Sequence, residues 1–169
     1  GHDVTLIDPW GAHIEAIRSK GLLISALDEE FTVQAEAVHL GEACNISEPF
    51  DAVFLCLKSY DTIWATHFVL PHLTPTGVII SAQNGINDER VAAIAGRERT
   101  LGCVITIGAG MYEPGHAIRT DTNAVGFKIG EQDGRDTPRA RELVEIVSSV
   151  APAHVTTKPW GARWATLAV

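Results

Sequence analysis

The chain has 169 residues, and 46% of them are hydrophobic, which suffices for one domain with its own core and a small additional segment. The formal net charge of −8 argues against nucleic acid or a membrane surface as a partner, because both attract basic proteins. The three cysteines show no pairing pattern and no run of 18 apolar residues is present, so we expect a protein of the reducing cytoplasm. Cys56 and Cys103 lie in apolar runs, where we expect them to pack as small hydrophobic residues.

Strands and helices are predicted to alternate along the chain. The predicted strands span 4–7, 22–25, 31–38, 51–58, 78–82, 101–107, 118–120, 124–130 and 154–157, and the predicted helices span 11–20, 61–71, 87–95, 138–150 and 160–169. The second and third strands flank three acidic residues, which indicates a β-hairpin. Alternation with short connections is typical of a Rossmann-like, doubly wound α/β fold with a mostly parallel sheet.

Apolar spacing also predicts several packing details. In the first helix, Ile14 and Ile17 share the inner face and Gly21 ends the helix. In the helix at 61–71, the inward-facing residues are predicted to be Ile63, Ala65, Phe68 and Val69. The tryptophans expected to serve in packing are Trp64, Trp160 and Trp164, and the turn expected before the strand at 78–82 is Pro75-Thr76-Gly77.

The strand at 51–58 carries six mostly apolar residues and closes with a lysine. An uninterrupted apolar run has no wet face, so we expect this strand to be buried on both sides, as in a parallel sheet covered by helices. A second apolar run at 78–82 is followed by Gln83-Asn84-Gly85. Because ligands collect at the carboxyl ends of parallel strands, Lys58 and these amides are candidates for contacting an anionic ligand. Taken singly, the lysine is also typical of a solvated strand end, and Asn84-Gly85 of a plain turn.

Asp8 follows the first predicted strand. In dinucleotide-binding folds, an acidic residue at the end of the second strand accepts hydrogen bonds from the ribose hydroxyls. The alternative is that Asp8 caps the turn or helix that follows. The glycine-rich phosphate loop that should precede such a strand is missing from the sequence. We therefore expect these 169 residues to be a fragment of a longer protein, with that loop upstream, and to be inactive by themselves.

Five short motifs follow one another along nearly the whole chain. They are Gly1-His2-Asp3-Val4-Thr5-Leu6-Ile7-Asp8; Cys56-Leu57-Lys58-Ser59; Gln83-Asn84-Gly85; Gly102-Cys103-Val104 with Glu113-Pro114-Gly115; and Trp164-Ala165-Thr166-Leu167-Ala168-Val169. Each motif is weak alone. Together and in this order, they resemble the ketopantoate reductase family (2-dehydropantoate 2-reductase, PanE/ApbA).

The resemblance implies reduction of a 2-keto acid such as ketopantoate to a 2-hydroxy acid with NAD(P)H, a step of pantothenate biosynthesis. It implies that Lys58, with Leu57 beside it, lies near the nicotinamide and the substrate, that Asn84 contacts both, and that the backbone of Gly108 approaches the cofactor. It further implies an incomplete NAD(P)-binding domain over residues 1–157 and the start of a helical substrate domain at 158–169. A homodimer would form through the rest of that helical domain.

Two positions modify what the resemblance implies. The family's general-acid lysine corresponds to Thr166, a far weaker acid, so we expect altered or weakened chemistry at this catalytic position. The alternatives are that Lys58 has taken over protonation, that the alignment is shifted near Arg163, or that position 166 tolerates change. Asp8 stands where NADPH-dependent members carry a basic residue. Because a carboxylate repels a 2′-phosphate, NAD is favoured over NADP.

Two other functions stay open. One is a dehydrogenase of the 6-phosphogluconate or 3-hydroxyacid type, which shares the cofactor fold and a helical second domain. The other is a non-catalytic dinucleotide-binding module that senses the redox state of its cofactor. Lys58 and Asn84 at neighbouring strand ends favour an enzyme, because a sensor has no substrate oxygen to polarise. We predict no metal ion, since none of the seven histidines has metal-ligand spacing with another.

Overall fold

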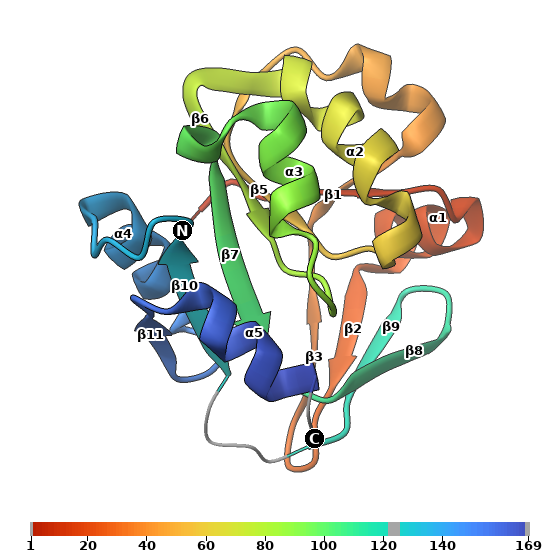
Figure 1. Ribbon diagram of the computed structural model, residues 1–169. Helices are drawn as coiled ribbons and strands as arrows, with labels where there is room; N and C mark the ends of the chain where they lie inside the picture. Colours follow the sequence, from red (N-terminus) through yellow and green to blue (C-terminus); the bar gives the residue numbers. More distant parts are fainter. Residues whose placement is uncertain (1, 122–125, 168–169) are drawn as a thin grey trace. The chain divides into compact units, whose positions relative to one another are not determined.

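A computed structural model describes residues 2–121 and 126–167, which belong to two compact units. The first unit combines Gly1–Ser47 with Ile107–Thr122, and the second combines Glu48–Thr106 with Asn123–Val169. Figure 1 traces the course of the chain through both units. No helix among the described residues combines the length and the apolar character that crossing a membrane requires.

The first unit contains two small sheets and one helix. β1 (Thr5–Asp8) pairs in parallel with β4 (Glu36–His39), and the other sheet has the order β3 (Glu30–Val33), β2 (Leu22–Ser25), β9 (His116–Arg119), β8 (Ala109–Glu113). Helix α1 (Gly11–Lys20) has the predicted bounds and buries Ile14 and Ile17 against Ala37. Gly21 ends it with a φ of 83°, a conformation that glycine adopts without strain.

The predicted β-hairpin is only partly confirmed. β2 and β3 pair antiparallel, but the run 31–38 divides into β3 and β4, and β4 pairs with β1 instead. The physical reason is burial: β3 is exposed along its whole length, whereas β4 packs Ala37 against α1. β8 was not predicted, because its largely exposed residues lack an apolar pattern.

The second unit is built on a five-stranded sheet. Its order is β11 (Ala153–Val155), β10 (Phe127–Glu131), β7 (Thr100–Ile105), β6 (Leu73–Ser81), β5 (Phe50–Leu55). β5, β6 and β7 are mutually parallel, and β10 is antiparallel to β7. The α-helices of this unit are α2 (Thr62–Val69), α3 (Asp88–Ala95), α4 (Pro138–Val147) and α5 (Pro159–Leu167). Short 3₁₀ turns occur at η1 (Leu40–Asn45) in the first unit and at η2 (Ser59–Asp61), η3 (Leu70–His72) and η4 (Arg97–Arg99) in the second.

The helices of the second unit cover different strands. α2 and α3 pack against β5, β6 and β7, while α4 packs against β10 and β11. α5 lies across β7 and β10 (Figure 1). The fold is the mixed, mostly parallel α/β arrangement predicted from the alternation of strands and helices.

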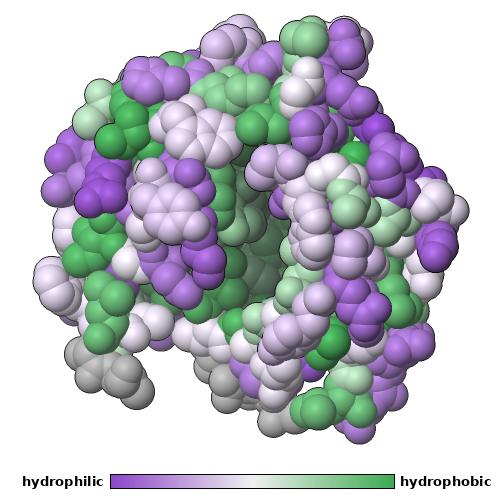
Figure 2. All heavy atoms as spheres, turned by 90° about the vertical axis from the view of Figure 1, so that its right-hand side faces the viewer, coloured by the Kyte–Doolittle hydropathy of each residue, from purple (hydrophilic) through white to green (hydrophobic). Residues whose placement is uncertain are grey.

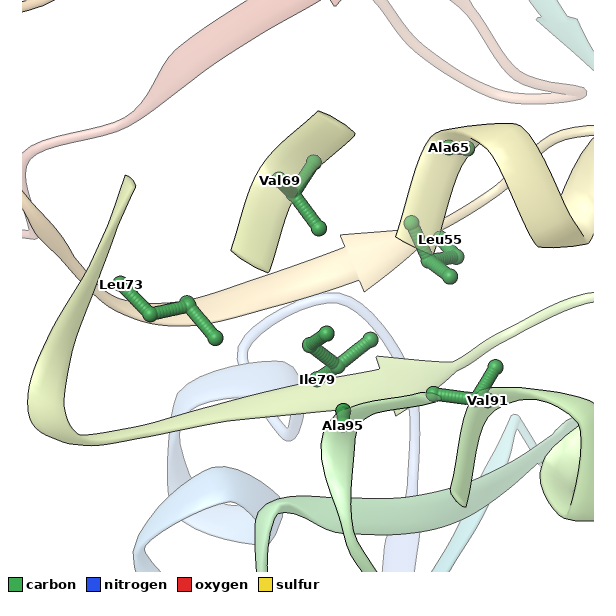
Figure 3. Close-up of a cluster of buried hydrophobic side chains, with 7 residues drawn as sticks. All are labelled: Leu55, Ala65, Val69, Leu73, Ile79, Val91 and Ala95. Atoms are coloured by element: carbon green, nitrogen blue, oxygen red, sulfur yellow. The ribbon is translucent and has the colours of Figure 1, made fainter. Parts of the chain in front are cut away.

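A hydrophobic core fixes α2 and α3 on β5 and β6. Figure 3 shows its seven buried side chains, Leu55, Ala65, Val69, Leu73, Ile79, Val91 and Ala95. Ile79 and Val91 are fully shielded from solvent. Each large aliphatic side chain buried in this way contributes roughly 1.5–3 kcal/mol, so the cluster holds the ends of both strands in place.

The burial of β5 differs from its prediction. Only Leu55 is buried, and the three residues before it are half-buried, because β5 has a single neighbouring strand in the described part of its sheet. The strand also ends at Leu55, so Cys56 and Lys58 lie in the connection beyond it, and Cys56 is exposed. Cys103 does pack as a small hydrophobic residue, and burial raises the pKa of its thiol to about 12.

The prediction for the inner face of α2 is wrong at one position. Ala65 and Val69 are buried, but Ile63 is 56% exposed. The buried stripe instead includes Thr62 and Thr66, whose hydroxyls donate to the carbonyls of Ser59 and Thr62. Two threonines can line a core because their hydroxyls bond back to the helix backbone, and this displaces the stripe away from Ile63.

Two further packing predictions are corrected. Trp64 and Trp164 are exposed rather than packed, and the Trp64 indole N–H donates to Asp61 Oδ1 at 2.6 Å. The predicted turn at 75–77 lies within β6, where pairing with β5 jumps from Leu73 to Val78.

Figure 2 shows one face of the molecule, on which hydrophobic and hydrophilic residues are intermixed. Scattered exposed apolar residues of this kind are normal for protein surfaces.

Candidate functional site

The candidate site lies at the carboxyl ends of β5 and β6. These strands are parallel neighbours, and Leu55 pairs with Ser81, so both end at the same level. The prediction that the residues after them share one edge of the sheet is therefore confirmed. Lys58 and Asn84 follow these two strands, and both are exposed.

Hydrogen bonds join the loop of Lys58 to the loop of Asn84. Gln83 Nε2 donates to the Lys58 carbonyl at 3.3 Å, and the Ser59 hydroxyl donates to the Asn84 carbonyl at 3.0 Å. Asn87 Nδ2 donates to Ser59 Oγ at 3.0 Å and to the Asn84 carbonyl at 2.9 Å. The network uses the backbone of Lys58 and Asn84, and within residues 2–121 and 126–167 their side chains have no hydrogen-bond partner. Both side chains are therefore free to meet a ligand.

A pocket opens beside the Asn84 loop. It has a volume of about 420 Å³ and is lined by Gln83, Asn84, Gly85, Val104, Ile105, Arg163, Thr166 and Leu167. This volume suits a small molecule. The pocket brings together Asn84 and Thr166, two predicted site residues that are far apart in the sequence. Lys58 lies in the adjoining loop rather than in the pocket lining.

The Thr166 hydroxyl is turned back into its own helix. It donates to the Ala162 carbonyl at 3.0 Å, although the residue is exposed. To donate to a substrate, the hydroxyl would have to give up this bond. A weak acid whose proton is already engaged is a poor replacement for a lysine ammonium.

Sequence analysis missed a buried ion pair at this site. Arg163 and Asp88 are each 4% exposed at the side chain, and the guanidinium donates twice to the carboxylate, from Nε to Oδ2 and from Nη2 to Oδ1, both at 2.6 Å. The sequence drew attention to Arg163 only as the residue near which the alignment could be shifted. A signal was present, because Asp88, Val91 and Ala95 form one helical stripe that places a carboxylate on the apolar face of α3.

The other donors of Arg163 bind backbone carbonyls at the end of β6. Nη2 donates to the Ser81 carbonyl at 2.6 Å, and Nη1 donates to the carbonyls of Gln83 at 2.8 Å and Gly85 at 3.2 Å. All five N–H groups of the guanidinium thus have acceptors inside the protein. Gly85 turns the loop with a φ of 86°, which explains the need for glycine beside Asn84.

Asp8 and Gly108 belong to the first unit. Asp8 Oδ1 accepts from the Trp10 backbone N–H at 2.7 Å and so caps the turn before α1, although α1 itself has no side-chain cap. Asp8 Oδ2 has no hydrogen-bond partner among the described residues. The Gly108 N–H donates to Asp121 Oδ2 at 2.6 Å, and a Cβ at this position would lie 3.0 Å from Thr120 Oγ1. A side chain at position 108 would therefore crowd Thr120 and Asp121.

The remaining candidate, Leu57, packs against the core of the second unit. Of the predicted site residues, Leu57, Lys58, Asn84 and Thr166 belong to this second unit. In the described ranges, no group of three or more histidine, cysteine, aspartate or glutamate side chains is placed to hold a metal ion.

The parallel strands and the loops at their carboxyl ends define a Rossmann-like α/β domain. The structure of 2-dehydropantoate 2-reductase from Geobacter metallireducens GS-15 superposes with a TM-score of 0.84 and 27% identity, over 99% of this chain and 54% of that one. The chain belongs to the ketopantoate reductase PanE/ApbA family, whose sequence profile matches residues 1–134. The resemblance carried by the five motifs is thus confirmed.

Two curated relatives are both named 2-dehydropantoate 2-reductase. The protein from Archaeoglobus fulgidus is 31% identical over 150 residues, which is 87% of this chain and 45% of the relative. The protein from Pyrococcus horikoshii is 38% identical over 117 residues, which is 68% of this chain and 36% of the relative. The chain therefore spans less than half the length of these relatives.

Proposed function

We propose that the protein reduces a 2-keto acid, ketopantoate or a close analogue, to the 2-hydroxy acid with NAD(P)H. The observation that carries the proposal is the shared edge of β5 and β6, where the side chains of Lys58 and Asn84 are free and a pocket of small-molecule size adjoins Asn84. Membership of the ketopantoate reductase family supports this reaction class.

A nicotinamide cofactor, when bound, would supply the hydride that adds to the ketone carbon. The residues fit such a group in one testable respect, since Asp8 keeps one carboxylate oxygen free to accept from a ribose hydroxyl. The other predicted contacts of the cofactor are Leu57, Lys58 and Asn84 in the second unit and Gly108 in the first. The chain's own part in the reaction is to stabilise and protonate the oxygen that becomes negative as the carbon is reduced.

Lys58 suits this part better than Thr166. Its ammonium has no partner in the described residues, so its charge and its proton are both available to the developing alkoxide. The Thr166 hydroxyl, by contrast, already donates to Ala162. We assign the proton to Lys58 and the orientation of the substrate to the Asn84 amide.

NADH is the cofactor that the residues favour. A carboxylate at Asp8 accepts from a free 2′-hydroxyl and repels a 2′-phosphate. Arg18, the first arginine of the chain, does not offset this, because it donates to the Ala37 carbonyl at 2.7 Å and pairs with Glu42 at 2.5 Å. A higher kcat/KM with NADPH than with NADH would refute this assignment.

The experiment uses the protein expressed from its native gene, with any residues that flank these 169. Ketopantoate reduction is followed by NADH and NADPH absorbance for wild type, Lys58→Ala, Thr166→Lys and the exposed control Lys20→Ala. We expect Lys58→Ala to lower kcat ~10²-fold or more, because a single electrostatic or proton-transfer contact typically accelerates the chemical step by this factor. Thr166→Lys should raise kcat, and Lys20→Ala should leave it unchanged.

Other outcomes separate the alternatives. Wild-type activity on 6-phosphogluconate or a 3-hydroxyacid, but not on 2-keto acids, would favour the related dehydrogenases. Cofactor binding without turnover of any of these compounds would favour the sensor. If the Lys58→Ala variant has a normal kcat, Lys58 is only a solvated residue after its strand and has no catalytic role.

A further inference from the structure

One buried arginine holds both sides of the proposed site. We infer that Arg163, together with Asp88, is a positioning residue that sets helix α5 and the Asn84 loop in their working geometry. The inference rests on the proposed 2-keto acid reduction. It assigns roles to two more residues, which position Asn84 and α5 and do not contact the substrate themselves.

The contacts of Arg163 bracket Asn84 on the chain. Its guanidinium donates to the carbonyls of Gln83 and Gly85, the residues immediately before and after Asn84. It also donates to the Ser81 carbonyl at the end of β6 and to the carboxylate of Asp88 at the start of α3. A single side chain thus fixes the strand end, the loop and the next helix.

The same residue also fixes α5. Arg163 and Thr166 are three apart on this helix, so they share a face, and both line the pocket. Any shift of the guanidinium moves the helix that carries Thr166 relative to the loop that carries Asn84. A shift of Arg163 also reaches the loop of Lys58 through Gln83, because the Gln83 side chain donates to the Lys58 carbonyl.

Arg163 has no donor left for a substrate. All five of its N–H groups have acceptors within the protein, and its side chain is 4% exposed. Gly102 on β7 makes room for the pair, since a Cβ there would lie 3.2 Å from Asp88 Oδ2. A charged network of this kind, satisfied and shielded from water, holds its members rigidly.

Lysine at position 163 is the informative substitution. It keeps the positive charge but offers three donors on one nitrogen, so it cannot serve the carboxylate and three carbonyls at once. We expect Arg163→Lys to loosen α5 and the Asn84 loop while the rest of the fold persists. Because small misplacements of reacting groups are costly, kcat should fall about 10- to 100-fold, with a smaller change in KM.

The test compares wild type, Arg163→Lys, Asp88→Asn and Arg139→Lys in the protein with its native flanking residues. Arg139 is the matched control, because it also makes a paired contact with a carboxylate in the same unit but does not line the pocket. Ketopantoate kinetics give kcat and KM, and hydrogen–deuterium exchange reports on residues 81–88 and 159–167. The expected result is a lower kcat and faster exchange in both segments for Arg163→Lys and Asp88→Asn, with Arg139→Lys unchanged in both respects.

The outcomes distinguish this inference from the proposed function. If kcat and exchange in Arg163→Lys match those of Arg139→Lys, the positioning role is wrong. If the wild type reduces no 2-keto acid, the proposed function fails, and the exchange data then decide the positioning role alone. Should Arg163→Lys unfold, Asp88→Asn, which keeps the size of the side chain, takes its place with the same expected result.

Discussion

Two arginines of the second unit hold helices through paired contacts with a carboxylate, yet their surroundings differ. Arg163 ties α5 to Asp88, and each side chain is 4% exposed. Arg139 ties α4 to Glu131, and here the arginine is 38% exposed while the glutamate is 5% exposed. The same type of ion pair is therefore buried at the candidate site and partly exposed to solvent on α4.

The difference in exposure matters because access to water sets the free-energy cost of the arginine left behind when its carboxylate partner is removed. A half-exposed arginine can turn to solvent and recover much of its hydration. A buried arginine cannot, and the free-energy cost of an uncompensated charge then dominates. Three substitutions probe this contrast: one in the buried pair, one in the partly buried pair, and one in a third pair in which both side chains are exposed.

Asp88→Ala should have the largest effect. It leaves the Arg163 guanidinium buried without a counter-charge, so we expect the free energy of unfolding to fall by about 3–5 kcal/mol. Urea denaturation followed by far-ultraviolet circular dichroism measures this change. A loss below about 1 kcal/mol would mean that water reaches Arg163 in the variant, and the contrast between the two pairs would collapse.

Glu131→Gln should cost less. The carboxylate accepts from Arg139 Nε and Nη2 and from the Thr137 hydroxyl, all at 2.6 Å. Hydrogen bonds to a charged group contribute about 1.5–3 kcal/mol, and the partly exposed Arg139 recovers some of this from water. Urea denaturation at pH 7 should show a loss toward the lower end of that range.

The effect of Glu131→Gln should also depend on pH. Burial raises the pKa of Glu131, but hydrogen bonds from Arg139 and Thr137 outweigh burial and bring the pKa below the usual 4.5. A group with a lowered pKa in the folded state stabilises the fold above its unfolded value, and this contribution disappears as the pH falls through the folded value. The stability gap between wild type and Glu131→Gln should therefore narrow as the pH falls below 4.5 and through the lowered pKa of Glu131. A gap that stays constant down to acid unfolding would contradict this assignment.

Arg141→Ala should have the smallest effect. Arg141 pairs with Asp136 at 2.8 Å, but the two side chains are 69% and 41% exposed. Such pairs are screened by water and salt, so we expect the urea midpoint to stay within experimental error of wild type. A loss comparable with that of Glu131→Gln would show that exposure is not what separates these pairs.

The parts of the fold that follow local rules could be predicted from the sequence. α1 has its predicted bounds because an apolar stripe and a stopping glycine define it completely. The shared edge of β5 and β6 was also predictable, because two apolar runs ending near polar residues are typical of parallel strands. Ile63 was misplaced because two threonines, polar by type, satisfy their hydroxyls within α2 and take the buried positions.

The centre of the candidate site could not be predicted in the same way. Arg163 and Asp88 are 75 residues apart, and a charged residue gives no sign in the sequence of a distant partner. Lys58 and Asn84 were found because each lies in the loop after an apolar strand, whereas Arg163 lies in a helix with no such landmark. The catalytic and cofactor-binding roles of Lys58, Asn84, Thr166, Asp8, Leu57 and Gly108 stay predictions until the kinetics are measured.

The direction of protein synthesis gives the acceptors of Arg163 a further consequence. Residues 81–88, which supply its carbonyls and its carboxylate, leave the ribosome well before Arg163 does, since these partners lie 75 to 82 residues earlier in the chain. Contacts this distant in sequence form late, because a long loop must close first. The pocket is therefore completed only when α5 docks against the end of β6 and the start of α3.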